Sequence, residues 1–198
     1  MYNILVTLYK EELLNNENTE IKTLDEFCNI FTGKKNANQY DEKGQYKFFT
    51  CGDKELRINS YIYDGPSIII SGNGSYTGRT TFYNGKYDLY QRTYACTIKD
   101  SVDKDFIYGL YIIIKNDLAK TISGGTHGSA IPYIVMDDLS KFKINYDENI
   151  FKSYSKKAKI MLNKIQHNNE ENETLIQLRD TLLPKLMNGE IDLENIEI

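Results

Sequence analysis

The segment from Glu148 to Gly189 limits what this chain can fold into more than any other feature of the sequence. It contains no glycine before Gly189, and apolar residues recur along it at the three- and four-residue spacing of one helix face. Pro184 and the pair Asn188-Gly189 mark its end, because proline removes an amide donor and glycine accepts the left-handed backbone of a helix terminus. The pattern predicts one helix of about 38 residues, roughly 57 Å long at 1.5 Å per residue.

The apolar stripe of this helix is too long to pack entirely on the rest of the chain, so we expect a second helix to cover it as a coiled coil. Two alternatives stay open: the helix lies flat on its own domain, or it breaks into a hairpin at residues 167–169. Asn168 in the seam would cost stability but would select register and partner. The residues expected at the interface are Tyr154, Ala158, Met161, Ile165, Asn168, Leu175, Leu178, Leu182 and Leu186.

The net charge of −4 is, taken alone, unfavourable for binding nucleic acid. The charge is unevenly distributed, however: residues 1–20 carry −3, residues 21–168 carry +5, and residues 169–198 carry −6. A basic centre between acidic ends permits a surface that faces DNA, although it does not require one.

The sequence points to a reducing compartment and to no membrane segment. No apolar run approaches the roughly 20 residues that span a bilayer. The amino-terminal residues reach acidic side chains too early for a secretory signal. The three cysteines, Cys28, Cys51 and Cys96, lack the spacing of a zinc site. We therefore expect a cytoplasmic protein without a metal.

Residues 21–146 mix the patterns of strands and helices, so we expect an α+β fold. Thr23 followed by Glu26 is a capping box and predicts a short helix. The dipeptide Asn84-Gly85 predicts a hairpin turn. Residues 103–120 are ambiguous, because three isoleucines favour a strand whereas Asp at the front and Lys at the back favour a helix. The expected strands are rich in β-branched and aromatic residues and cover residues 46–50, 67–71, 80–83, 89–98, 131–136 and 142–144.

The motifs of common enzymes are incomplete in this sequence. The loop at residues 72–78 follows an apolar strand and has the glycine spacing of a dinucleotide site, but the next residues predict a strand where that site needs a helix. Glu20 and Lys22 have the spacing of a nuclease motif without the preceding aspartate. An adenine methyltransferase needs adjacent prolines, and Pro66, Pro132 and Pro184 are all separate.

Three polar loops instead have the chemistry of DNA contacts. Glycine lets the backbone approach phosphates, arginine and lysine read guanine edges, and asparagine reads adenine edges. The alternative is that these are ordinary surface loops, which use the same residue types. The candidate DNA-binding residues are Lys34, Lys35, Asn36, Asn38, Asn73, Ser75, Tyr76, Arg79, Thr126, His127 and Ser129.

The order of these motifs resembles the DNA-specificity subunits of Type I restriction-modification systems. Residues 23–34 resemble the entry to a target recognition domain, residues 68–78 resemble its central strand and glycine loop, and residues 124–144 resemble its closing segment. Residues 172–191, with the run Leu182-Leu183-Pro184-Lys185, resemble the end of the family's spacer helix. The family has a helix where residues 103–120 lie, which favours a helix there too.

The resemblance implies a half-size specificity subunit with one recognition domain and one spacer helix. It divides the chain into an extension at residues 1–20, a recognition domain at 21–146, and a helix with a short tail at 147–198. The implied partners are double-stranded DNA, a second copy or a second half-subunit, methyltransferase subunits that bind S-adenosylmethionine, and a restriction subunit. The chain itself would hold no cofactor and catalyse nothing. An adaptor that dimerises without DNA and an unrecognised enzyme remain as alternatives.

Overall fold

The computed structural model describes residues 2–123 and 133–190, which belong to two compact units, Met1–Lys159 and Ile160–Ile198. This division differs from the expected one. Residues 1–20 are not a separate extension, because Leu5, Tyr9 and Leu13 are buried in the first unit. The first unit also includes the first turns of the long helix, so its end lies after the expected boundary at residue 146.

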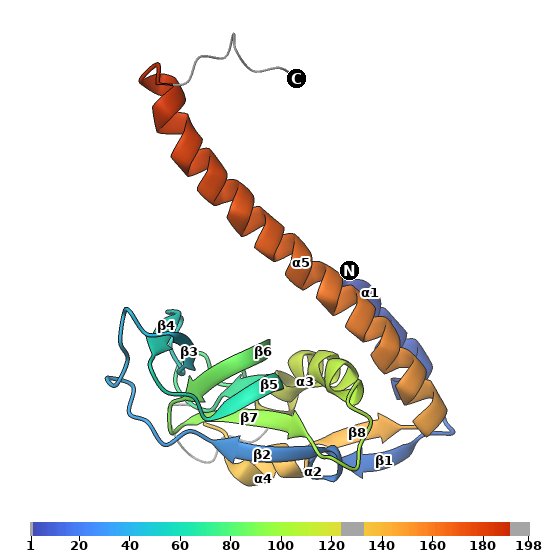
Figure 1. Ribbon diagram of the computed structural model, residues 1–198. Helices are drawn as coiled ribbons and strands as arrows, with labels where there is room; N and C mark the ends of the chain where they lie inside the picture. Colours follow the sequence, from blue (N-terminus) through green and yellow to red (C-terminus); the bar gives the residue numbers. More distant parts are fainter. Residues whose placement is uncertain (1, 124–132, 191–198) are drawn as a thin grey trace. The chain divides into compact units, whose positions relative to one another are not determined.

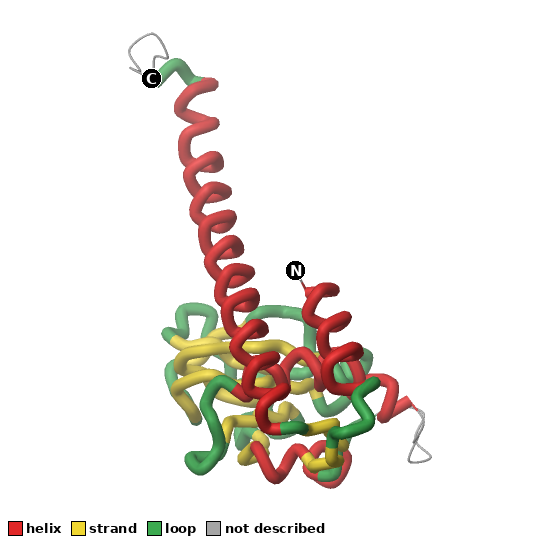
Figure 2. Tube along the Cα trace, turned by 90° about the vertical axis from the view of Figure 1, so that its right-hand side faces the viewer, coloured by secondary structure: helices red, strands yellow, loops and turns green. Residues whose placement is uncertain are grey.

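The first unit is built on a six-stranded sheet and a two-stranded sheet, which hold all the strands of the described residues (Figures 1 and 2). The six strands run in the order β2 (Cys28–Thr32), β7 (Thr93–Ile98), β5 (Tyr63–Ser71), β6 (Thr80–Leu89), β3 (Tyr46–Phe49) and β4 (Leu56–Ile58). All neighbours are antiparallel except β3 and β6, which are parallel. The smaller sheet pairs β1 (Glu20–Thr23) with β8 (Lys143–Tyr146) in antiparallel orientation. These sheets and their helices confirm the α+β fold.

Helix α3 (Phe106–Ser123) covers one face of the sheet (Figure 1). Its residues Leu110 and Ile114 are fully buried, as are Ile68 and Ile70 of β5. Because side chains alternate across a strand, Ile69 faces the other way and belongs to the apolar cluster on the opposite face. The helix expected at residues 103–120 is therefore confirmed.

The opposite face of the sheet is packed with aromatic rings. Tyr87 is completely buried there, and Phe49 and Tyr83 lie against it with ring centroids 5.8 and 5.9 Å away. The hydroxyl of Tyr87 donates a 2.8 Å hydrogen bond to the Ser67 hydroxyl, which satisfies its one polar group. Many of the chain's tyrosines thus serve the core rather than the surface.

The amino-terminal helix packs against the beginning of the carboxy-terminal helix. Helix α1 (Tyr2–Tyr9) continues into a π-helical turn, η1 (Lys10–Leu14), and α5 (Glu148–Met187) begins beside it. The rings of Tyr9 and Tyr154 have centroids 6.5 Å apart, and Tyr154 is completely buried. These contacts explain why the first turns of α5 belong to the first unit.

Two short helices complete this unit, and both are capped by local hydrogen bonds. At the start of α2 (Leu24–Phe27), the Thr23 NH donates to Glu26 Oε1 at 2.8 Å, which confirms the capping box. At the start of α4 (Met136–Ser140), the Val135 NH donates to Asp138 Oδ2 at 2.8 Å.

The predicted hairpin at Asn84-Gly85 is wrong. Strand β6 runs straight through these residues, and Gly85 stands opposite Gly65 of β5 in the ladder. Both glycines have a positive φ, 140° and 137°, a conformation that other residues rarely adopt. The pair therefore gives the sheet a local distortion in mid-strand, where the sequence pattern suggested a turn.

The strand expected at residues 89–98 is also wrong in its extent. It is divided by a turn at residues 90–92, with β6 ending before the turn and β7 beginning after it. The strand expected at 131–136 is replaced at its described end by the start of α4, since Met136 opens that helix.

The second unit consists of the later part of α5, whose 40 residues form one continuous helix. The helix therefore does not break at residues 167–169. Its end matches the prediction: Pro184 lies in the last turn, and Gly189 has φ of 71°. Leu175, Leu178 and Met187 are 55, 52 and 78% exposed. Within residues 2–123 and 133–190, no helix has both the length and the apolar character needed to cross a bilayer.

Candidate nucleic-acid interface

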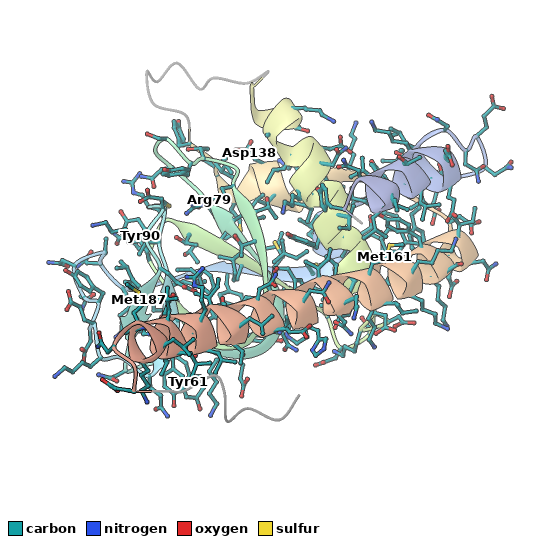
Figure 3. All side chains as sticks on the ribbon, turned by 90° about the horizontal axis from the view of Figure 1, so that it is seen from above. Tyr61, Arg79, Tyr90, Asp138, Met161 and Met187 are labelled. Carbon is teal, nitrogen blue, oxygen red and sulfur yellow. The ribbon has the colours of Figure 1, made fainter. Side chains whose placement is uncertain are left out.

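Several loops at the ends of the strands meet in the first unit, and we call them the loop cluster. Its centre is the turn at residues 90–92, between β6 and β7. Figure 3 shows that Arg79 and Tyr90, from two of these loops, lie on the same side of the unit. The cluster comprises residues 34–39, 50–55, 72–79 and 90–92.

The 90–92 turn is bonded to two other strand ends through its backbone. The NH of Tyr90 donates to the oxygen of Phe49 at 2.9 Å, at the end of β3. The NH of Gln91 donates to the oxygen of Lys35 at 2.9 Å, and Lys35 forms an isolated parallel bridge with Tyr90. These bonds place the predicted residue Lys35 directly beside the turn.

Gly72 lies close to the 90–92 turn and is hydrogen-bonded to Arg92. Its NH donates a 3.0 Å hydrogen bond to the oxygen of Arg92, and a Cβ added to Gly72 would stand only 2.3 Å from that oxygen. Its own oxygen accepts a 2.8 Å bond from the Ile134 NH. Only glycine allows the glycine loop to approach the turn this closely.

The 72–79 loop is a folded turn and not the entrance to a helix. The Gly78 NH donates to the Ser71 oxygen at 2.9 Å, and the Thr77 NH donates to the Gly74 oxygen at 3.1 Å. Gly74 and Gly78 have φ of 82° and 83°, so glycine is needed at both positions. Because β6 follows directly at Thr80, the loop has no helix dipole behind it to bind a pyrophosphate.

Arg79 connects two loops of the cluster. Its guanidinium donates a hydrogen bond to the main-chain oxygen of Gly52, in the turn between β3 and β4. The same group stacks on the ring of Tyr76, with Cζ 4.5 Å from the ring centroid. Arg79 is thus exposed but already bound within its own protein.

A cavity of about 270 Å³ lies between the β3–β4 turn and Arg79. Charges of both signs line it: Lys47, Lys54 and Arg79 face Asp53 and Glu55. The Lys47 ammonium is already paired with the Glu55 carboxylate. This pairing leaves the cavity without a concentration of one charge, so it is a poor pocket for a small ion.

The segment that follows the undescribed residues 124–132 is tied to the cluster. Tyr133 forms an antiparallel bridge with Asn73, and the Tyr94 hydroxyl donates to the Ile134 oxygen at 2.9 Å. Burial raises the pKa of Tyr94, and the nearby Asp138 carboxylate raises it further while Arg92 lowers it. Tyr94 therefore stays protonated and keeps its donor at neutral pH.

The structure brings most of the described candidate residues into this cluster. Lys34, Asn36, Asn38, Ser75, Tyr76 and Arg79 are exposed, whereas Lys35 and Asn73 are half-buried. Asn36 also helps to shape its own segment, because its NH donates to the Gln39 side chain at 2.7 Å. Thr126, His127 and Ser129 lie outside the described residues.

Sequence reasoning missed the centre of the cluster. The sequence pattern predicts a strand through residues 90–92, although the polar triplet Tyr90-Gln91-Arg92 between two apolar runs is a usable signal for a turn. The turn at residues 50–55 was also missed. Together the four segments of the cluster hold five basic and two acidic residues, a net charge of +3.

The expected coiled-coil interface needs a correction at its beginning. Tyr154 and Ala158 are completely buried in the first unit, so neither is available to a second helix. The remaining candidates lie in the second unit and are partly or fully exposed: Met161, Ile165, Asn168, Leu175, Leu178, Leu182 and Leu186.

In the part of the chain that the structure describes, no group of three or more His, Cys, Asp or Glu side chains is placed to hold a metal ion. Cys28 and Cys96 are buried in paired strands, and burial raises the pKa of both thiols, that of Cys28 to about 12. Neither buried thiol has the electropositive, accessible surroundings of a reactive cysteine.

Comparison with known proteins agrees with this architecture. The chain is 31% identical over 176 residues to the Type I restriction enzyme EcoDI specificity subunit of Escherichia coli, an alignment that covers 86% of this chain and 38% of that protein. It is 25% identical over 146 residues to the MjaIX specificity subunit of Methanocaldococcus jannaschii, covering 72% of this chain and 34% of that one. The chain thus spans well under half of these relatives.

A solved structure shows the same fold. The S subunit of a Type I restriction-modification system from M. genitalium superposes with a TM-score of 0.70 at 20% identity, over 88% of this chain and 48% of that chain. The family model described as the Type I restriction modification DNA specificity domain matches residues 16–146. This range includes every strand of the described residues and the whole loop cluster. The chain belongs to the family of Type I restriction-modification DNA specificity proteins.

Proposed function

We propose that this chain reads one part of a bipartite double-stranded DNA target through the loop cluster, as a specificity component of a Type I restriction-modification complex. The observation that carries the proposal is the convergence of three polar segments on the 90–92 turn. Together the four segments have a net charge of +3, in a chain whose total charge is −4. A local positive surface on an acidic protein favours a phosphate-rich partner.

The chemistry of the cluster suits recognition of both backbone and bases. The exposed Lys34 and Lys54 can neutralise phosphates, and the amides of Asn36, Asn38 and Gln91 can pair with base edges. Because the loops are bonded to one another through their backbones, they present these groups with little ordering cost on binding.

The second unit supports pairing with another helix. Leu175 and Leu178 are more than half exposed, and an amphipathic helix of this kind is stabilised when a partner covers its apolar side. We propose an antiparallel coiled coil with a second copy or with another half-subunit. The length of the paired helices would then set the distance between two half-sites, and a homodimer would read an inverted repeat.

We further propose that catalysis is left to other subunits of the complex, in the cytoplasm where the DNA target lies. A methyltransferase subunit would supply S-adenosylmethionine and the adenine-binding pocket, and a restriction subunit would cleave. The acidic carboxy-terminal region, with net charge −6 over residues 169–198, favours protein contacts over DNA contacts.

The proposal is tested by isolating the affinity-tagged full chain with its bound subunits and mapping adenine methylation on a plasmid library after adding S-adenosylmethionine. We expect methylation at a bipartite sequence and binding that weakens steeply as salt rises, because phosphate contacts release counterions. Methylation without a sequence preference, or binding that does not depend on salt, would contradict DNA recognition. A stable dimer that never binds duplex DNA would favour the adaptor role instead.

A further inference from the structure

We infer that Gln91 and Arg92, at the tip of the 90–92 turn, read the bases, whereas Arg79 positions the loops around them. This inference rests on the proposed function, because it assigns specificity within the DNA-binding surface. It changes the role expected for Arg79, which the sequence singled out as a direct DNA contact.

The backbone of the turn is held from several directions. Gln91 donates its NH to Lys35, and Arg92 accepts from Gly72. The Cys51 thiol donates to the same Arg92 oxygen at 3.2 Å. A turn that is bonded on both sides cannot shift easily, so side chains that leave it begin from a well-defined position.

The side chains of the turn differ from its backbone in this respect. Both Gln91 and Arg92 are exposed, and among the described residues neither side chain forms a hydrogen bond or an ion pair. Base readout needs a fixed backbone that carries side chains able to form new hydrogen bonds, and the Gln91 amide and the Arg92 guanidinium meet this requirement.

The other arginines of the chain are already bound. Arg57 donates to the main-chain oxygens of Gly44 and Gln45, each at 3.2 Å. Arg79 donates to Gly52 and stacks on Tyr76, and Arg179 pairs with Asp180 at 2.6 Å. Of the four arginines in the sequence, Arg92 alone keeps its guanidinium free of hydrogen bonds and ion pairs in the described structure.

The two residue types match two different bases. A guanidinium donates two parallel hydrogen bonds to O6 and N7 of guanine, and a glutamine amide pairs with N6 and N7 of adenine. Adjacent residues on one turn would reach adjacent base pairs. The target half-site should therefore contain a guanine next to an adenine, or one base pair away from it.

The experiment compares wild type with Arg92→Lys and Gln91→Ala. Each full chain is isolated with its bound subunits and used to select duplexes from a randomised double-stranded DNA library. For Arg92→Lys we expect binding to bulk DNA to persist, because the charge remains. The preference for guanine at one position should fall about 10- to 100-fold, because lysine lacks the planar fork. Gln91→Ala should relax one neighbouring position by a similar factor.

The matched control is Arg57→Lys, which makes the same change at a guanidinium bound to main-chain oxygens outside the cluster. It should select the wild-type sequence. Arg79→Lys should weaken binding to all sequences alike, because it loosens the loops without removing a base contact. Thermal unfolding followed by circular dichroism checks that each variant is folded.

The outcomes separate this inference from the proposed function. If wild type selects a defined sequence and Arg92→Lys and Gln91→Ala select the same sequence with equal preference, the assignment of these residues is wrong while DNA recognition stands. If Arg79→Lys changes one base position selectively, Arg79 reads that base and the positioning role is wrong. If wild type selects no sequence at all, both the inference and the proposed function fail.

Discussion

The hydroxyl of Tyr154 donates a 3.2 Å hydrogen bond to the main-chain oxygen of Leu5, and both residues are completely buried. The two residues are 149 positions apart, so this contact joins the two ends of the first unit. It assigns the first turns of α5 to the fold of this unit, whereas the apolar residues from Met161 onward belong to the second unit.

Removing this contact should destabilise the first unit. Tyr154→Phe deletes the hydroxyl and its hydrogen bond to the Leu5 oxygen, which should cost about 1 kcal/mol. Tyr154→Ala also leaves a cavity and should cost about 3–5 kcal/mol. Urea denaturation measures both values. The control is Lys156→Ala, an exposed change in the same turn of helix, which should alter the free energy of unfolding by less than about 0.5 kcal/mol.

A charge within the apolar side of the second unit should prevent helix pairing. Leu182→Asp places a carboxylate where we propose a partner helix, and burying an unpaired charge is strongly unfavourable. We expect the sedimentation coefficient of the full chain to change from that of a dimer to that of a monomer. Gln177→Asp introduces the same charge on a different side of the helix and should leave the dimer intact. Equal sedimentation of the two variants would contradict the proposed seam.

A methyl group at Gly72 should displace the 90–92 turn. The added Cβ would stand 2.3 Å from the Arg92 oxygen, so the turn must move or the hydrogen bond must break, at a cost of about 1–3 kcal/mol. We expect Gly72→Ala to lower stability and weaken DNA binding. Gly52→Ala is the matched control in the same cluster, because its nearest neighbouring atom would be at an ordinary 3.5 Å. A normal affinity in Gly72→Ala would show that the turn's position does not matter for binding.

Stability should fall at alkaline pH. Burial raises the pKa of Cys28 from 9.0 to about 12, and it raises the pKa of Tyr9, Tyr87 and Tyr154 above 10.0. The unfolded groups therefore lose protons that the folded groups keep. The contribution of these groups to the free energy of unfolding is fully present below pH 9, and it is lost as the pH rises through their folded pKa values. Each such group should lower stability by about 1.4 kcal/mol per pH unit.

Urea titrations between pH 8 and pH 11 measure this loss. Burial also raises the pKa of Cys96, so two buried thiols contribute between pH 9 and pH 10. Cys28→Ala removes one of them, so its stability curve should fall less steeply in this range than the wild-type curve. Identical slopes in the two proteins would show that the Cys28 thiol does not contribute.

The thiols should react in a definite order. Cys51 is half-buried in the loop cluster, whereas Cys28 and Cys96 are buried in β2 and β7. We expect a thiol reagent to label Cys51 in the native protein and the other two only after unfolding, as mass spectrometry of digested protein would detect. Because the Cys51 thiol donates to the Arg92 oxygen, bound DNA should slow this labelling. Faster labelling of Cys28 or Cys96 than of Cys51 would contradict the described packing.

Features that depend on neighbouring residues could be predicted from sequence. The capping box at Thr23 and Glu26 and the helix end at Pro184 and Gly189 have the predicted geometry, because each depends on hydrogen bonds and backbone preferences within a few positions. The order of such local motifs also sufficed to recognise the family. The predicted turn at Asn84-Gly85 failed because the same dipeptide is used in mid-strand, opposite another glycine.

Tertiary structure alone decided which groups meet. The sequence presented one apolar stripe from Tyr154 to Leu186, and only the tertiary packing showed that Tyr154 and Ala158 are buried by their own chain. The sequence likewise indicated Arg79 as a candidate DNA contact. In the fold, Arg79 is instead hydrogen-bonded to Gly52, whereas the Arg92 guanidinium forms no hydrogen bond or ion pair with the described residues. Periodicity and residue type describe what a side chain can do, but its partner is chosen by contacts between residues far apart in the chain, which no local pattern encodes.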